Sequence, residues 1–121
     1  MLTVLSGCSQ RLPTLTVTFF DVGKGDCILL ECDGHASMMD AGFDNTAKDI
    51  LSALADKGID TLDFLLLTHM DKDHVGGADK FLENLTIGAV YAPDYEKDAK
   101  QYQQYVDALA ASGMTAIHPA E

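Results

Sequence analysis

The sequence predicts one α+β domain, and three observations support this prediction. Residues 14–40 are rich in strand-forming residues and contain tight-turn signals, which is typical of a β-meander. Residues 44–117 alternate between segments with helical spacing of apolar residues and short apolar runs. The chain has 121 residues, of which 47% are hydrophobic, so it is globular rather than disordered and forms one domain or less.

The first part of the chain is expected to form three strands. Residues 14–21 alternate and are rich in Thr, Val and Phe, so they predict a strand. A turn over residues 22–26 leads into a second strand at residues 27–32. The Asp-Gly dipeptide at residues 33–34 is a strong hairpin signal, and residues 36–40 form the returning strand.

A helix is expected after this meander. It begins near Asp44 or Asn45, either of which can cap it, and runs to about Lys57, where Gly58 is a natural C-terminal stop. Its apolar residues have helical spacing: Ala47, Ile50, Leu51 and Leu54. The next strand is expected at residues 65–67, whose continuous aliphatic run indicates burial on both faces.

The remaining residues are expected to add two helices and two strands. Residues 78–84 predict a short helix, and residues 87–92 predict a strand. Residues 96–112 predict a longer helix that ends at Gly113 and leads into a strand at residues 114–117. Its packing positions follow helical spacing: Tyr102, Tyr105, Val106 and Leu109.

The loop after residues 65–67 concentrates residue types that bind metals. The candidate ligands are His69, Asp71, Asp73 and His74. Imidazole and carboxylate are common ligands of Zn²⁺ and Mn²⁺ at hydrolytic centres. In an extended loop the first three would point the same way, and His74 would lie on the other side and close around a second ion. The sequence therefore predicts two metal ions that share a bridging water; an acidic surface loop with two exposed histidines is the alternative.

The charge of the chain limits its partners. The formal net charge is −11, from 19 acidic and 8 basic residues, which argues against a broad basic nucleic-acid groove. It does not exclude a phosphodiester substrate bound through metal ions, because bound cations reverse the local charge. Cys27 and Cys32 bracket a predicted strand at an odd separation, so they are expected to be free and at least half-buried rather than bonded to each other.

The first residues resemble the end of a bacterial lipoprotein signal. Residues 5–8 read Leu-Ser-Gly-Cys, like a lipobox whose Cys8 is lipidated after cleavage. Because a complete signal has a charged start and a longer apolar stretch, the segment is either a truncated signal or an accidental match. The first interpretation assigns residues 1–13 to signal and linker and residues 14–121 to the domain. It predicts an extracytoplasmic protein that Cys8 anchors to the bacterial membrane, or otherwise a secreted one.

Three motifs, in order, resemble those of a known family. Residues 68–77 read THMDKDHVGG and resemble the H-x-H-x-D-H signature of the metallo-β-lactamase fold, with Asp71 in place of the second histidine. With FFDVGKGD at residues 19–26 and MDAG at residues 39–42, they are similar to the metallo-β-lactamase-like domain of ComEC-type competence proteins and their stand-alone relatives. Lys24 stands where that family usually has Gln.

The resemblance, over about residues 15–113, implies the N-terminal half of an αββα metallo-β-lactamase sandwich. In that fold two sheets pack face to face, the helices lie outside, and the metals sit at one edge. The family supplies a third His, a bridging Asp and a final His from its second half, and His118 is not expected to replace any of them. An uncovered apolar sheet face costs roughly 25 cal/mol per Å². We therefore expect a further segment, a partner chain or a dimer to complete the fold.

The resemblance also implies a role for each candidate ligand. His69 and Asp71 would bind the first metal ion, and Asp73 and His74 would bind the second. Asp73 would also act catalytically, by holding the proton of the bridging water during attack. Because a carboxylate replaces an imidazole, the site is harder, and Mn²⁺ is as plausible as Zn²⁺.

Residues outside the loop are expected to support it. Asp40 would lie beneath residues 69–74, which we call the metal loop, and would help to orient them. Asp21 and Asp26 are assigned the same supporting role. Gly23 and Gly25 either let the backbone approach the site closely or are ordinary turn glycines.

The leading functional hypothesis is a ComEC-like, metal-dependent hydrolase of phosphodiesters, and the resemblance alone implies DNA as the substrate. Hydrolysis of esters or amides, including β-lactams, fits Asp71 less well. The first alternative is a non-catalytic metal-binding or interaction remnant that lacks the second half of the site. A further alternative is a half-site that is completed by another chain.

Overall fold

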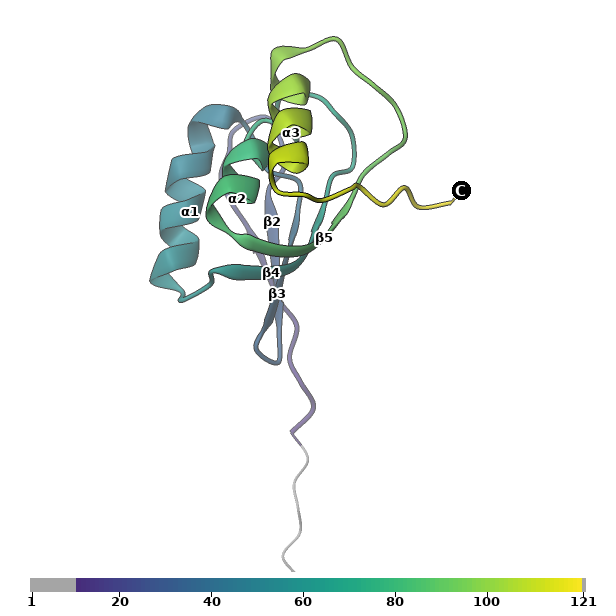
Figure 1. The fold of residues 1–121 in the computed structure, drawn as a ribbon. Coiled ribbons are helices and arrows are strands. Elements are labelled where there is room, and N and C mark those ends of the chain that lie inside the picture. Colours follow the sequence, from purple (N-terminus) through teal and green to yellow (C-terminus); the bar gives the residue numbers. More distant parts are fainter. Residues whose placement is uncertain (1–10, 121) are drawn as a thin grey trace, which may run out of the picture.

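The structure is a five-stranded sheet with helices packed against it. The computed structural model describes residues 11–120, so Cys8 and most of the predicted signal lie outside the described residues. The strands follow chain order across the sheet: β1 (Thr16–Phe19), β2 (Ile28–Cys32), β3 (His35–Met39), β4 (Thr61–Leu66) and β5 (Thr86–Tyr91). This architecture confirms the predicted α+β class (Figure 1).

The sheet combines an antiparallel and a parallel part. β1, β2 and β3 pair antiparallel, as the predicted meander requires. The hairpin between β2 and β3 turns at Asp33 and Gly34, whose φ angles are 51° and 81°. Two left-handed residues in succession match the twist of the flanking strands. β4 and β5 each pair parallel to the preceding strand, so each needs a crossover connection.

Helices provide these crossovers. The helices are α1 (Ala47–Asp56), α2 (Ala78–Asn84) and α3 (Lys100–Ala111), and a 3₁₀ turn, η1 (Asp44–Thr46), precedes α1. α1 connects β3 to β4, and α2 connects β4 to β5. Right-handed crossovers that step in one direction across a sheet place their helices on the same face, which is the arrangement in Figure 1. None of the helices in residues 11–120 is long and apolar enough to span a membrane.

The hydrophobic core lies between the sheet and the helices. Register partners form a row across β2 to β5: Leu29, Met38, Leu65 and Val90. All four side chains are fully buried. Leu54 of α1 and Phe81 of α2 belong to the same buried cluster. The sheet therefore places its most apolar register positions under the crossover helices.

The opposite face of the sheet is also apolar, but it is open in the part of the chain that the structure describes. Neighbouring register positions form a second row across the five strands: Phe19, Ile28, Met39, Leu66 and Tyr91. Phe19 is 73% exposed, and the others are partly exposed. Phe64 packs edge-on against Tyr91, with ring centroids 5.9 Å apart. An uncovered apolar face is the feature expected of half a sandwich.

The last helix begins later than the sequence pattern predicts. α3 begins at Lys100 rather than at residue 96. The hydroxyl of Tyr95 accepts a hydrogen bond from the backbone N–H of Met70, at 2.9 Å, so the segment before α3 reaches across to the metal loop. Ala99, the residue before α3, is extended, with a φ of −154°. A tertiary contact therefore overrides the helical periodicity at these residues.

Strand lengths also differ from the prediction. β4 begins at Thr61, well before the aliphatic run at residues 65–67. The predicted strand at residues 114–117 is reduced to a single parallel bridge between Ile117 and Tyr91. Short apolar runs identify strands more reliably than they identify strand ends.

The two faces of β4 predict different costs for the same substitution. Leu65→Ala should lower the free energy of unfolding by about 2–5 kcal/mol, because it leaves a cavity in the covered core. Leu66→Ala, on the open face, should cost clearly less, because water can fill the space. Urea denaturation of both variants measures the difference. Equal losses would show that the second face is covered as well.

Candidate metal centre

The candidate ligands lie in the loop between β4 and α2, at the carboxyl end of β4. The loop turns at Asp71, because the backbone N–H groups of His74 and Val75 both donate to the Asp71 carbonyl at 2.9 Å. The loop is therefore not extended as the alternating pattern had suggested. The turn brings His74 to the same side as His69 and Asp73, and ligand atoms of these three residues lie within 4.8 Å of one another.

The four candidate ligands form two close pairs. Nε2 of His69 lies 3.6 Å from Oδ2 of Asp71. Nε2 of His74 lies 3.8 Å from Oδ2 of Asp73. Two ligand atoms on one tetrahedral ion, each about 2.1 Å from it, are roughly 3.4 Å apart. The imidazole rings of the two pairs are neighbours, with centroids 3.8 Å apart. Each pair can therefore share an ion after a small adjustment, and the two ions would be adjacent.

Asp40 determines which nitrogen of His74 faces the metal site. Its carboxylate is 2% exposed and accepts hydrogen bonds from the backbone N–H of Thr68 (2.8 Å) and from the Thr68 hydroxyl (2.6 Å). Nδ1 of His74 lies 3.0 Å from the same carboxylate. A proton on Nδ1 satisfies this contact and leaves the lone pair of Nε2 free, on the side of Asp73. The structure thus brings Asp40 to the loop that it was expected to orient.

The other two predicted supporting carboxylates differ from each other. Asp26 lies near the site, with Oδ2 3.7 Å from Nδ1 of His74. Asp26, Asp40 and His74 also offer ligand atoms within 4.8 Å, but both oxygens of Asp40 already accept hydrogen bonds. Asp21 is exposed, accepts a hydrogen bond from the N–H of Gly23 at 3.2 Å, and belongs to neither ligand group.

Two glycines allow the backbone to pack tightly around the metal loop. Gly25 has a φ of +154°, and a Cβ there would lie 2.3 Å from the carbonyl oxygen of Asp73. A Cβ at Gly76 would lie 2.3 Å from the carbonyl oxygen of Lys72. The N–H of Asp26 also donates to the Asp73 carbonyl, at 3.3 Å. The turn at residues 22–26 therefore packs directly against the candidate ligands.

Sequence analysis did not identify three residues that contact the candidate ligands or the loop that carries them. The first is Thr68, whose hydroxyl bridges Asp40 and the ring of His69. The others are Tyr95, through the bond to Met70 described above, and Lys97, which forms an ion pair with Oδ1 of Asp71. Thr68 belongs to the central motif and could have been found there. The other two lie in a segment whose contacts depend on the fold.

Cys27 lies next to Asp26 but within the core. It is 1% exposed, and its Sγ lies 3.6 Å from Sδ of Met38. Burial, with the negative charge of Asp40 nearby, raises the pKa of the Cys27 thiol to about 12. Cys27 is therefore an uncharged thiol at neutral pH. Cys32 is also free and half-buried, as expected.

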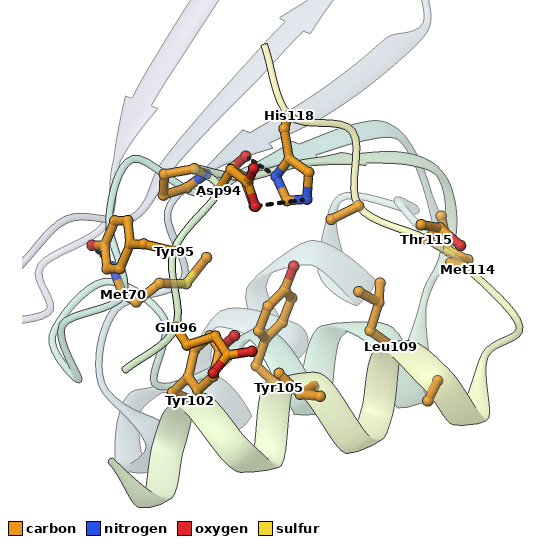
Figure 2. Close-up of a pocket in the computed structure, with 15 residues that line it drawn as sticks. Met70, Asp94, Tyr95, Glu96, Tyr102, Tyr105, Leu109, Met114, Thr115 and His118 are labelled. Carbon is orange, nitrogen blue, oxygen red and sulfur yellow. Dashed lines mark hydrogen bonds and ion pairs between the residues drawn. The ribbon is translucent and has the colours of Figure 1, made fainter. Parts of the chain in front are cut away.

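His118 belongs to a different part of the molecule. It lines a cavity of about 370 Å³ beside α3, where its Nδ1 lies 2.9 Å from the carbonyl oxygen of Ala92 (Figure 2). Tyr105 points into this cavity; its hydroxyl is buried and has no hydrogen-bond partner among the described residues. Burial raises the pKa of Tyr105 to about 12. His118 belongs to neither of the two ligand groups found among the described residues.

The match to a family model decides the family of this chain. The model, described as the metallo-beta-lactamase superfamily, matches residues 20–119. The chain belongs to the metallo-beta-lactamase superfamily. The matched residues include the metal loop, Asp40 and Asp26, so the candidate site lies within the superfamily domain.

The chain is shorter than the proteins that it resembles. This chain is 30% identical, over 79 residues, to a hydroxyacylglutathione hydrolase of Aeromonas salmonicida. The aligned residues cover 65% of this chain and 30% of that protein. A structure of a Cronobacter sakazakii metallo-beta-lactamase with a HARLDQ motif matches with a TM-score of 0.55 and 23% identity, over 64% of this chain and 30% of that one. A Thermotoga maritima structure, described as a candidate metallo-beta-lactamase, matches with a TM-score of 0.57 and 18% identity. This match covers 92% of this chain and 61% of the Thermotoga maritima chain. The two structures support the fold, and the chain spans less than two thirds of each relative.

Asp40→Asn tests how the metal loop is oriented. An amide is uncharged and has only one acceptor oxygen, so it binds the Nδ1–H of His74 and the two Thr68 donors less well than the carboxylate does. The affinity for Zn²⁺ should therefore fall about 10–100-fold. Competition with a coloured chelator measures the affinity. Asp56→Asn, at the exposed end of α1, is the matched control. Unchanged affinity in Asp40→Asn would argue against an orienting role.

Gly25→Ala tests the close contact with Asp73. The new Cβ would displace the Asp73 carbonyl and should weaken Zn²⁺ binding, in addition to destabilising the fold. Gly23→Ala is the control, because Gly23 also has a positive φ (+75°) but no atom lies within 4 Å of its added Cβ. Both variants should lose about 1 kcal/mol of stability through backbone strain. Equal Zn²⁺ affinities in the two variants would show that the contact does not position the ligands.

Proposed function

We propose that the chain carries the catalytic loop of a ComEC-like, metal-dependent hydrolase that cleaves phosphodiester bonds, with DNA as the substrate. The observation that carries this proposal is the pairing of one imidazole with one carboxylate at each of two adjacent positions, His69 with Asp71 and His74 with Asp73. Two adjacent ions suit the in-line displacement at phosphorus, because they stabilise both the attacking and the leaving oxygen.

The residues present fit divalent metal ions. The donors are imidazole nitrogens and carboxylate oxygens, and a buried carboxylate orients one of the imidazoles. We propose two ions, with Zn²⁺ and Mn²⁺ as the candidates, because the oxygen-rich donor set is harder than one built from histidines alone. When bound, the ions would supply a water of lowered pKa and a positive charge for the developing oxyanion.

The side chains of this chain have separate tasks in this proposal. Asp73 would hold the proton of the attacking water, because its carboxylate offers an oxygen within 4.8 Å of ring nitrogens of both His69 and His74. Asp40 orients His74 by accepting a hydrogen bond from its Nδ1, so that Nε2 lies on the side of Asp73. Lys97 holds Oδ1 of Asp71 and leaves Oδ2 facing His69.

The proposal also includes the surroundings of the site. The open apolar sheet face supports completion of the fold by a further segment, a partner chain or a dimer, which would bring the remaining metal ligands. The lipobox-like residues 5–8 support an extracytoplasmic protein tethered to a bacterial membrane through Cys8.

A second candidate function is thioester hydrolysis. It is favoured by the 30% identity over 79 residues to a protein named hydroxyacylglutathione hydrolase. Asp71 stands in place of the second histidine of the superfamily signature. This substitution favours phosphodiester hydrolysis over thioester hydrolysis. A chain that binds metal but hydrolyses neither substrate would be a non-catalytic metal-binding module.

Metal content and hydrolysis test the proposal together. The purified chain should contain about two Zn²⁺ or Mn²⁺ ions by mass spectrometry and should hydrolyse bis(p-nitrophenyl) phosphate faster than a hydroxyacylglutathione. Asp73→Ala and His74→Ala should each lose metal and activity, whereas Asp56→Ala should keep both. Metal binding without phosphodiester hydrolysis, or faster thioester hydrolysis, would overturn the proposal.

A further inference from the structure

We propose that Lys24 and Lys72, together with Lys97, form an anion subsite that holds a phosphate group adjacent to the phosphate being cleaved. This inference rests on the proposed phosphodiester hydrolysis and adds the means of substrate recognition. The three lysines line one pocket of about 390 Å³, which also contains Asp71 and Asp73 of the metal loop. We call it the lysine pocket.

The charge distribution of the chain makes this pocket unusual. The sequence carries 19 acidic residues against 8 basic ones, and seven of the basic residues are lysines. Three of those seven line the lysine pocket. Among the described ion pairs, Lys97 has Asp71 as its partner, whereas none involves Lys24 or Lys72. Two ammonium groups are therefore available to an incoming anion.

Three segments carry these lysines, and each is fixed to the metal loop. Lys72 lies in the loop itself, between Asp71 and Asp73. Lys24 is held by its neighbour Gly25, which packs against the carbonyl of Asp73, and by the backbone hydrogen bond from Asp26 to the same carbonyl.

The third segment is fixed from the other side. The Tyr95 hydroxyl accepts the N–H of Met70, and Lys97 is paired with Asp71. All three segments that carry the lysines are therefore in contact with the metal loop, although the lysine side chains themselves are exposed.

The chemistry of the pocket fits a nucleic-acid strand. Such a strand carries one negative phosphate for every nucleotide, so a phosphate held at the metals has a charged neighbour along the chain. Lysine binds phosphate as a flexible point charge and carries no sequence information. Phe43, which also lines the pocket, offers an apolar surface to a sugar or base. The pocket thus suits strands of any sequence.

The neighbouring cavity shows the opposite character. The cavity in Figure 2 is lined by Asp94, Glu96 and His118, with no lysine or arginine among its lining residues. The lysine pocket also contains two carboxylates, but its three lysines offset them, whereas the cavity has no lysine or arginine to offset Asp94 and Glu96. An anionic substrate that extends from the metal loop is therefore expected to follow the lysine pocket rather than the cavity beside α3.

The test compares two double substitutions with the same change in charge. Lys24→Gln/Lys72→Gln alters the lysine pocket, and Lys48→Gln/Lys57→Gln alters two exposed lysines of the α1 region. The probe is a phosphorothioate oligothymidylate, bound to the Zn²⁺-loaded chain and followed by fluorescence anisotropy at several salt concentrations. Metal content, measured by mass spectrometry, should be equal in all three proteins.

The pocket variant should bind the probe at least about 10-fold more weakly. The slope of log K against log salt should fall by about 1.4, because each neutralised phosphate contributes about 0.7 for single strands. The control variant should match the wild type in both quantities. Equal weakening by the two double substitutions, or no weakening by either, would overturn the inference.

Failure of this inference can be told apart from failure of the proposed function. Hydrolysis of bis(p-nitrophenyl) phosphate by the wild-type chain reports the proposed function, since that compound has a single phosphate. Hydrolysis together with pocket-independent binding would overturn the anion subsite and leave the hydrolase. Pocket-dependent binding without hydrolysis would support the subsite and overturn the hydrolase.

Discussion

The buried carboxylate of Asp40 is the interaction on which the rest of the site depends. A charge that is 2% exposed is costly unless donors surround it, and here Thr68 supplies two donors and His74 a third. Because Asp40 directly follows β3 and Thr68 follows β4, one side chain joins the ends of two parallel strands to the loop beyond them. Its left-handed backbone, with a φ of 56°, is a conformation that aspartate tolerates better than most residues. The backbone strain at Asp40 is therefore small, and its carboxylate accepts three hydrogen bonds that join β3, β4 and the metal loop.

Most of the site is built from segments without regular secondary structure, and contacts between these segments give it rigidity. The turn at Gly25 packs against the carbonyl of Asp73, and Tyr95 bonds to Met70. Each contact joins a different loop to the same ligand loop. The sheet and its crossover helices provide the fixed edge, and the loops provide the chemistry. This division explains how a chain of 121 residues can hold four candidate ligands and three lysines within a small region.

Much of the fold could be predicted from the sequence, because its signals are local. The Asp33–Gly34 hairpin and the spacing of Ile50 and Leu54 depend on neighbours in the chain, and the structure has both elements. The density of ligand types from His69 to His74 located the site for the same reason. The start of α3 and the contacts of Tyr95 were missed, since they depend on where distant segments meet. The turn at Asp71, which brings the two imidazoles together, is also set by backbone hydrogen bonds that periodicity does not reveal.

The state of Cys27 has a consequence for the redox behaviour of this corner of the molecule. Oxidants and soft ions such as Cu⁺ react with a cysteine only when its thiol is both deprotonated and accessible to solvent. Cys27 is 1% exposed, and its pKa is raised to about 12, so it offers neither charge nor access. Sulfenic acid formation and capture of soft ions are therefore suppressed beside Asp26, although a sulfur lies so near. The nitrogen and oxygen donors of the loop therefore face no competition from a thiolate at Cys27.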